Sequence, residues 1–242
     1  MKSKIFIYDF DGTFTPYPIT RFKILECCGW SGVDDFKLLK DKIKEKMIND
    51  SLGQYEAIYD CFFEVIKEAG YLLNDDNVSL GAGELEYNSG VVPFLRNISA
   101  YNVKNYLVSS GIKVLLNRTI ISKYFTDIYA TTFKYNQDNL IEGIDFLMTD
   151  KKKVAAIKEI LKCNGIAEDD CRNVVFVGDG LSDLYAMEYV KEHGGISVCV
   201  YLDDNSDVVS IAKEKDVVNL FAYADYSEGS LLNNYLKEAY NE

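Results

Sequence analysis

Two aspartates separated by one residue, in the sequence Asp9-Phe10-Asp11-Gly12-Thr13, follow an apolar run that is typical of a buried strand. Alternate side chains of extended backbone share a face, and Gly12 permits the bend that would direct both carboxylates to one site. Carboxylates this close repel each other unless they share a cation or one is protonated. The pair therefore indicates a functional site, and the alternative is an ordinary Asp-Gly turn in solvent.

A second acidic sequence, Gly178-Asp179-Gly180 followed by Asp183, closes another apolar run. Because the carboxyl ends of parallel strands meet at one edge of a sheet, we expect these carboxylates beside the first pair. Oxygen ligands with no His or Cys nearby select a hard cation, and Mg²⁺ is the common choice with substrate phosphates. The alternative, a surface turn, is weakened because both acidic segments end predicted strands.

Hydroxyl and amino groups could complete the same edge. The sequence Ser109-Ser110-Gly111 ends a third apolar run before a predicted helix, where an O–H donor and free backbone N–H groups would form an anion pocket. A plain serine helix cap is the alternative. The run Lys151–Lys153 begins a later helix, and one of its three ammonium groups could reach this edge, although lysines near a helix start usually face solvent.

The elements that must position these groups alternate along the chain. Apolar runs rich in β-branched residues are separated by amphipathic segments, such as the one in which Val154, Ile157 and Ile160 share a face. This alternation predicts an α/β fold with a doubly wound, mostly parallel sheet that is covered by helices on both faces. The predicted strands are Lys4–Tyr8, Asn105–Val108, Ile128–Thr131, Val174–Val177, Ile196–Val200 and Val217–Leu220.

Residues 16–90 interrupt this alternation with helical periodicity and no strand of the buried type. Leu39, Ile43 and Met47 recur every four residues, and a largely aromatic stripe follows from Tyr55 to Ile66. We predict a small helical cap domain over residues 16–90, inserted into a catalytic core of residues 1–15 and 91–242. Within that core, the sequence Asn-Gln-Asp-Asn at 136–139 is typical of a hairpin turn.

The 242 residues carry 26 basic and 38 acidic side chains, which gives a formal net charge of −12. Such a chain lacks the basic face that a nucleic acid or an anionic membrane surface requires, so neither is expected as a partner. The six cysteines form no Cys-x-x-Cys pair and accompany one histidine, which disfavours a zinc site. Neither a signal peptide nor an apolar run of about 20 residues is recognisable, which favours a cytoplasmic protein with reduced thiols.

Together these segments resemble the haloacid dehalogenase superfamily of phosphohydrolases. The insert is similar to the helical cap of its phosphoserine-phosphatase-like branch. Asp11 distinguishes the sequence from the dehalogenating members, which lack the second aspartate. The matching motifs, in the family's order over nearly the whole chain, are Asp9-Phe10-Asp11-Gly12-Thr13, the strand-end Ser109, Lys153, and Gly178-Asp179-Gly180 with Asp183.

The resemblance implies an Mg²⁺-dependent phosphatase for a small phosphorylated metabolite. Asp9 would attack phosphorus to form an aspartyl-phosphate, and Asp11 would act first as general acid and then as general base. Asp9, Asp179 and the Asp11 carbonyl would bind Mg²⁺. Asp183 would orient a metal-bound water or Lys153 rather than bind the metal directly.

The resemblance also assigns phosphate binding. Ser109 and the Ser110 N–H would hold phosphoryl oxygens, with Lys153 neutralising charge on the intermediate. Two other functions stay open on this fold: a phosphotransferase or phosphomutase that uses the same intermediate, and a catalytically silent regulatory binding protein. The intact motifs argue against the silent protein.

Three departures from the resemblance count against phosphoserine as the substrate. One is Ser182, which stands where the acidic motif of phosphoserine phosphatases holds an Asn. Pro18 stands where phosphoserine phosphatases carry a Glu for the amino group, and Tyr59 stands where they carry an Arg for the carboxylate. Arg21, the only arginine before Arg96, is the candidate for contacting a substrate anion, and Tyr59 is a second candidate for specificity. An ordinary surface arginine and a packed cap core are the alternatives.

Overall fold

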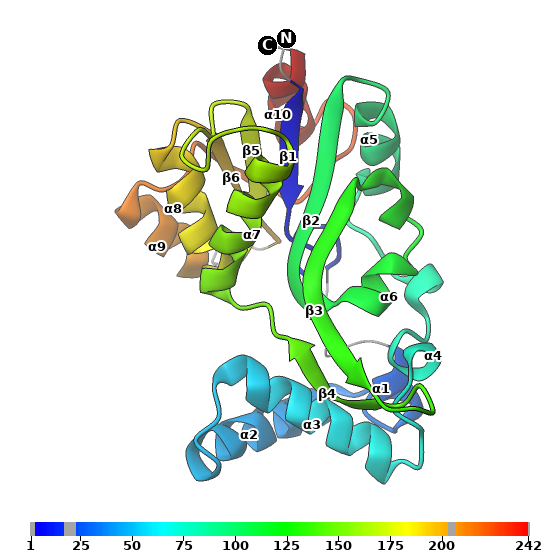
Figure 1. Cartoon of the computed structure of the whole chain (residues 1–242). Helices are drawn as coiled ribbons and strands as arrows, with labels where there is room; N and C mark the ends of the chain where they lie inside the picture. Colours follow the sequence, from blue (N-terminus) through cyan, green and yellow to red (C-terminus); the bar gives the residue numbers. More distant parts are fainter. Residues whose placement is uncertain (1–2, 17–22, 203–206, 242) are drawn as a thin grey trace.

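The computed structural model describes residues 3–16, 23–202 and 207–241, whose strands form one sheet in the order β4-β3-β2-β1-β5-β6-β7. Neighbouring strands are parallel except for β3 and β4. The sheet is twisted and central to the molecule (Figure 1). The strands are β1 (Lys4–Tyr8), β2 (Val103–Ile112), β3 (Asp127–Tyr135), β4 (Ile141–Phe146), β5 (Val174–Gly178), β6 (Ile196–Tyr201) and β7 (Leu220–Tyr223).

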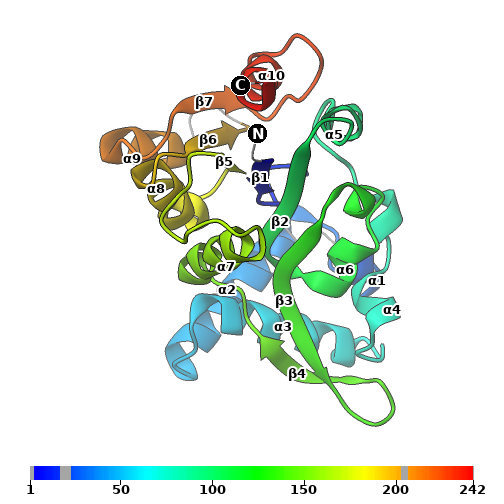
Figure 2. The same ribbon diagram turned by 45° about the horizontal axis from the view of Figure 1, so that its top comes forward.

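Helices cover both faces of this sheet (Figures 1 and 2). Alternate strand residues point to opposite faces, so Ile5 and Ile7 of β1 contact one helical layer while Phe6 and Tyr8 contact the other. The predicted doubly wound α/β fold is therefore confirmed. The first layer consists of α7 (Asp150–Cys163), α8 (Leu184–Glu192) and α9 (Asp207–Lys215), and the second of α5 (Val91–Ile98), α6 (Lys113–Asn117) and α10 (Leu231–Asn241).

A helical segment lies between β1 and α5, and we call its residues 23–84 the cap segment. Its two long helices, α2 and α3, lie side by side next to β4 (Figure 1). None of the described helices of the chain is long and apolar enough to span a bilayer. The separation of a cap domain at residues 16–90 stays a prediction. The helices of the cap segment are α1 (Lys23–Cys27), α2 (Val33–Asn49), α3 (Gln54–Glu68) and α4 (Asp75–Val78), followed by the 3₁₀ turn η2 (Ala82–Glu84).

The apolar core of the cap segment includes residues of the sheet. Phe133 of β3 contacts two rings of α3, with ring centroids 6.0 Å from Tyr59 and 5.4 Å from Phe63. Ile141, the first residue of β4, is buried in the same cluster, and its N–H donates to the carbonyl of Leu73 at 2.7 Å. The cap segment and the β3–β4 hairpin thus share one hydrophobic core.

The structure differs from the prediction at several strands, and β2 and β3 extend beyond their predicted ends. The predicted turn at 136–139 is present, with Asn139 at φ 59, but the strand that follows it, β4, was not predicted. The last strand begins at Leu220 rather than at Val217. Val217 and Val218 are buried in the helical layer that contains α8 and α9. Their apolar character therefore reflects packing in that layer and not strand pairing.

Candidate active site

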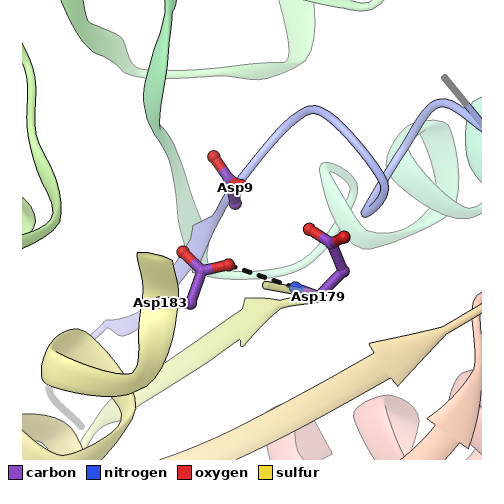
Figure 3. Close-up of side chains that lie close together, drawn as sticks. All are labelled: Asp9, Asp179 and Asp183. Atoms are coloured by element: carbon purple, nitrogen blue, oxygen red, sulfur yellow. Dashed lines mark hydrogen bonds between the residues drawn. The ribbon is translucent and has the colours of Figure 1, made fainter. Parts of the chain in front are cut away.

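The carboxyl ends of β1 and β5 bring three aspartates together (Figure 3). These strands are neighbours, with Tyr8 opposite Val177, and the Asp9 N–H donates to the Val177 carbonyl at 2.9 Å. Asp9 therefore leaves the sheet beside Asp179, and Asp183 follows at the start of α8. Carboxylate oxygens of the three aspartates lie within 4.8 Å of one another.

Two glycines allow this close approach. Gly12 has φ 76, in the left-handed region, and a Cβ atom on it would lie 2.0 Å from Asp179 Oδ2. A Cβ atom on Gly178 would lie 2.6 Å from Asp183 Cγ. Any larger residue at either position would push an acidic side chain out of the cluster, which explains why glycine is needed in both motifs.

Lys153 is the lysine of the 151–153 run that reaches the site. Its Nζ lies 3.1 Å from Asp9 Oδ1 and 2.7 Å from Asp183 Oδ1. Lys153 is on the buried face of α7 and is 0% exposed, whereas Lys151 and Lys152 are exposed. The geometry of one helical turn thus resolves a choice that the sequence left open.

Asp183 connects this lysine to the loop that carries Asp179. One oxygen of Asp183 accepts from Lys153, and the other accepts from the N–H groups of Asp179 at 3.2 Å and Gly180 at 3.0 Å. Asp183 is fully buried. Its position therefore fixes both the ammonium group and the backbone on which the Asp179 carboxylate is mounted.

The site holds more negative than positive charge. Burial raises the pKa of Asp9 to about 7, with Asp183 adding to the rise and Lys153 opposing it. Burial, Asp183 and Asp9 raise the pKa of Asp179 well above its ordinary value. Burial lowers the pKa of Lys153, but the carboxylates of Asp183 and Asp9 outweigh burial and raise it, so the amine is a cation. Among the described residues, Asp9, Asp179 and Asp183 lie around the ammonium group of Lys153, and Asp11 is an electrostatic neighbour of Asp179. An oxygen-only set of this kind fits a bound Mg²⁺.

The third predicted segment lies in an irregularity of β2. Ser109 was expected at the strand end, but β2 continues to Ile112, and its pairing register with β3 shifts between Val108 and Ile112. Ser109, Ser110 and Gly111 occupy that shift. Irregularities of this kind change the direction of side chains and are common next to active sites. The residue types of the segment alone do not reveal such a shift.

Ser109 and Asp11 lie on either side of Gly111. The Gly111 N–H donates to Ser109 Oγ at 3.0 Å, which leaves the hydroxyl hydrogen of Ser109 for another acceptor. A Cβ atom on Gly111 would lie 3.2 Å from Ser109 Oγ and 3.9 Å from Asp11 Oδ2, so these two groups flank the glycine. The Ser110 hydroxyl oxygen is buried beside the hydroxyl of Tyr55.

Two tyrosines of α3 approach this segment from the cap. Tyr59 is 3% exposed and its hydroxyl donates to the Ser110 carbonyl at 2.6 Å. Tyr55, one turn earlier, bonds the carboxylate of Asp150 at the start of α7, and burial followed by this bond raises the pKa of Tyr55 to about 12. Sequence reasoning missed Tyr55, although its four-residue spacing from Tyr59 was a usable signal. Arg21, the other specificity candidate, lies outside the described residues.

Thr131 of β3 is a further residue that sequence reasoning missed. Its hydroxyl donates to the Ser110 carbonyl at 3.0 Å and accepts from the Met148 N–H at 3.2 Å. It is fully buried. No local pattern identifies such a residue, because its role depends on the neighbouring strand.

Comparison with known proteins supports the same family. A model of the haloacid dehalogenase-like hydrolases matches residues 6–188. An uncharacterized protein of Borreliella burgdorferi is 22% identical over 276 residues, which cover 96% of this chain and 94% of that protein. A substrate-bound phosphoserine phosphatase complex has a TM-score of 0.65 at 16% identity, over 98% of this chain and 99% of the other. A HAD family hydrolase of Salmonella enterica serovar Typhi has a TM-score of 0.64 at 18% identity, over 91% and 67%. The two structures share the fold.

Proposed function

Because the chain belongs to the haloacid dehalogenase-like hydrolases, we propose that it is an Mg²⁺-dependent phosphatase that hydrolyses a small phosphorylated metabolite through an aspartyl-phosphate intermediate. The observation that carries the proposal is the environment of Asp9. This carboxylate is 6% exposed, ends the central strand, and contacts Lys153 inside a cluster of aspartates. A buried carboxylate beside a cation is suited to act as a nucleophile toward an anionic ester.

In the first step an Asp9 carboxylate oxygen attacks phosphorus. A bond forms between this Asp9 oxygen and phosphorus while the bond between phosphorus and the leaving-group oxygen breaks. Protonated Asp11 donates its proton to the leaving-group oxygen, so that the leaving group departs as an alcohol. Lys153 favours the ionised form of Asp9, because its ammonium group lies 3.1 Å from the nucleophile.

In the second step water attacks the phosphorus of the aspartyl-phosphate. Asp11, now a carboxylate, accepts a proton from the water, the bond between Asp9 and phosphorus breaks, and inorganic phosphate is released. Both carboxylates return to their starting states. Asp11 Oδ2 lies on the Gly111 side of the site, near the Ser109–Gly111 segment that would hold the phosphoryl group.

Asp9, Asp179 and the backbone carbonyl of Asp11 are the groups that would hold Mg²⁺. When bound, the ion supplies positive charge that offsets the repulsion between the ionised nucleophile and the substrate phosphate. Asp183 is better placed to orient Lys153 or a metal-bound water than to bind the metal itself. Its two oxygens already accept from Lys153 and from the backbone of residues 179 and 180.

Ser109, Ser110 and Lys153 bind and stabilise the transferring phosphoryl group. Ser109 donates its hydroxyl hydrogen, the Ser110 N–H donates from the backbone, and Lys153 balances charge. Support comes from the Ser109 hydroxyl, whose oxygen accepts from the Gly111 N–H while its hydrogen is left for a ligand.

The test is a panel of small phosphate esters incubated with purified protein, with Mg²⁺ and with a chelator, while released inorganic phosphate is measured. We expect Mg²⁺-dependent release from at least one ester. Repeating the reaction with a second alcohol present distinguishes hydrolysis from phosphotransfer, since a transferase would yield a new phosphate ester. The absence of release from every ester in Mg²⁺ would overturn the proposal.

A further inference from the structure

We propose that Tyr59 is a positioning residue: its hydroxyl, together with that of Thr131, holds the Ser110 carbonyl and thereby orients the Ser109–Gly111 segment for phosphoryl binding. This inference rests on the proposed phosphatase function. It assigns a residue of the cap segment to the machinery of the core, and it replaces the expectation that Tyr59 contacts the substrate itself.

The ring and the hydroxyl of Tyr59 contact different parts of the molecule. The ring is packed in the cap core, with centroids 6.3 Å from Phe63 and 6.0 Å from Phe133. The hydroxyl leaves that core and reaches Ser110 O at 2.6 Å. A phenylalanine would satisfy the packing equally well, so packing alone does not account for the hydroxyl.

The Ser110 carbonyl receives two donors from different elements. Tyr59 approaches from α3 at 2.6 Å and Thr131 from β3 at 3.0 Å, and two donors fill both lone pairs of a carbonyl oxygen. Thr131 is itself held by the Met148 N–H. The direction of this carbonyl is therefore set jointly by the cap segment and by the sheet.

Peptide planarity transmits that direction to the site. The Ser110 carbonyl and the Gly111 N–H belong to one planar peptide group, and in a trans peptide they point in opposite directions. The Gly111 N–H is the group that donates to Ser109 Oγ at 3.0 Å. Fixing the carbonyl from the cap side consequently fixes the donor that holds the Ser109 hydroxyl in place for a phosphoryl oxygen.

The experiment compares Tyr59→Phe with wild type in steady-state hydrolysis of 4-nitrophenyl phosphate and in direct binding of inorganic phosphate by calorimetry, both in Mg²⁺. We expect kcat/KM and phosphate affinity to fall roughly threefold to tenfold, the range that one ordinary hydrogen bond contributes. The Mg²⁺ concentration for half-maximal activity should not change, because Tyr59 contacts none of the carboxylates assigned to the metal in the described structure.

Tyr135→Phe is the matched control. It removes a phenol hydrogen bond of 2.7 Å between β3 and Asp75 of α4, which also joins the sheet to the cap segment. We expect it to leave both readouts unchanged. Equal losses of kcat/KM and of phosphate affinity in Tyr59→Phe and Tyr135→Phe would overturn the inference, because they would reflect general loosening of the cap segment.

Two further outcomes are decisive. If Tyr59→Phe does not fold, Thr131→Val removes the other donor from the same carbonyl, and unchanged phosphate affinity in that variant overturns the inference. If the wild-type protein binds phosphate and hydrolyses the ester, and Tyr59→Phe does both equally well, only the inference is overturned. A wild-type protein that does neither, and that releases no phosphate from any ester of the panel described above, overturns the proposed function, and the inference with it.

Discussion

Lys153 and Asp183 form a fully buried ion pair, with Nζ 2.7 Å from Oδ1. The same lysine also contacts Asp9, so the proposed nucleophile and the pair form one charged network. Buried ion pairs of this kind contribute modestly to stability while intact, but they leave an uncompensated charge when one partner is removed. The first prediction follows from that asymmetry.

Lys153→Met should destabilise the protein by about 3–5 kcal/mol, because Asp9 and Asp183 would face each other without a cation. Urea unfolding in the presence of a chelator measures the change. Lys151→Met is the matched control, since Lys151 is exposed on the same helical turn, and it should change stability little. Equal stability of the two variants would contradict the prediction.

Asp9→Asn should abolish hydrolysis while the fold is retained, because an amide of the same shape is not a nucleophile toward phosphorus. We expect a loss of several orders of magnitude in kcat. Phosphate release measures the activity, and thermal unfolding checks the fold. Asp138→Asn, an exposed change in the hairpin turn, serves as control. Substantial turnover by purified Asp9→Asn would disprove the nucleophile assignment.

Activity should vanish with a chelator and return with Mg²⁺ more readily than with Ca²⁺. Both ions accept oxygen ligands, but Ca²⁺ prefers more ligands at longer distances, which would disturb in-line attack. The measurement is phosphate release after exhaustive chelation and titration with each ion. Full activity in the chelated protein, or a requirement for zinc, would rule out the proposed metal.

Without metal, the protein should be more stable at about pH 6 than at about pH 8. Burial raises the pKa of Asp9 to about 7, above the ordinary value of 3.8, and it raises that of Asp179 as well. The folded state therefore binds more protons than the unfolded chain in this range, and the free energy of unfolding falls as pH rises.

Thermal unfolding of the chelated protein between about pH 6 and about pH 8 tests whether stability falls as pH rises. Asp9→Asn should weaken the pH dependence, because it removes a carboxyl whose pKa is raised. Mg²⁺ should weaken it too, by favouring the ionised carboxylates. A midpoint that increases with pH in the chelated wild type would show that the carboxyl pKa values are not raised.

Phosphoserine should be a poor substrate. Tyr59, at the position expected of an arginine, directs its hydroxyl to Ser110, and Pro18, which lies outside the described residues, offers no carboxylate. Each missing charge-assisted hydrogen bond is worth roughly 1.5–3 kcal/mol, so two together lower kcat/KM by more than about a hundredfold. The check is kcat/KM for phosphoserine against other small phosphate esters. A wide preference for phosphoserine would show that the pocket recognises it by other groups.

The sequence predicted the parts of this fold that depend on local pattern. Strands β1 and β5 are buried on both faces and read as continuous apolar runs, so their ends, with Asp9 and Asp179, could be placed. Residue types alone left three lysines open and the resemblance pointed to Lys153; the rotation of α7 against the sheet is what brings Lys153 to the site. The Thr131 contact and the shift of β2 at Ser109 required the neighbouring strand, because cross-strand register has no signature within a single segment.

The hydrophobic core that joins Tyr59 and Phe63 to Phe133 and Ile141 bears on how this protein could be engineered. A chimera that receives a relative's residues 23–84 alone would keep Phe133 and Ile141 and place a foreign helical surface on them. Mismatched core volumes destabilise. The transplantable module is therefore discontinuous in sequence, and it consists of the cap segment together with the β3–β4 hairpin.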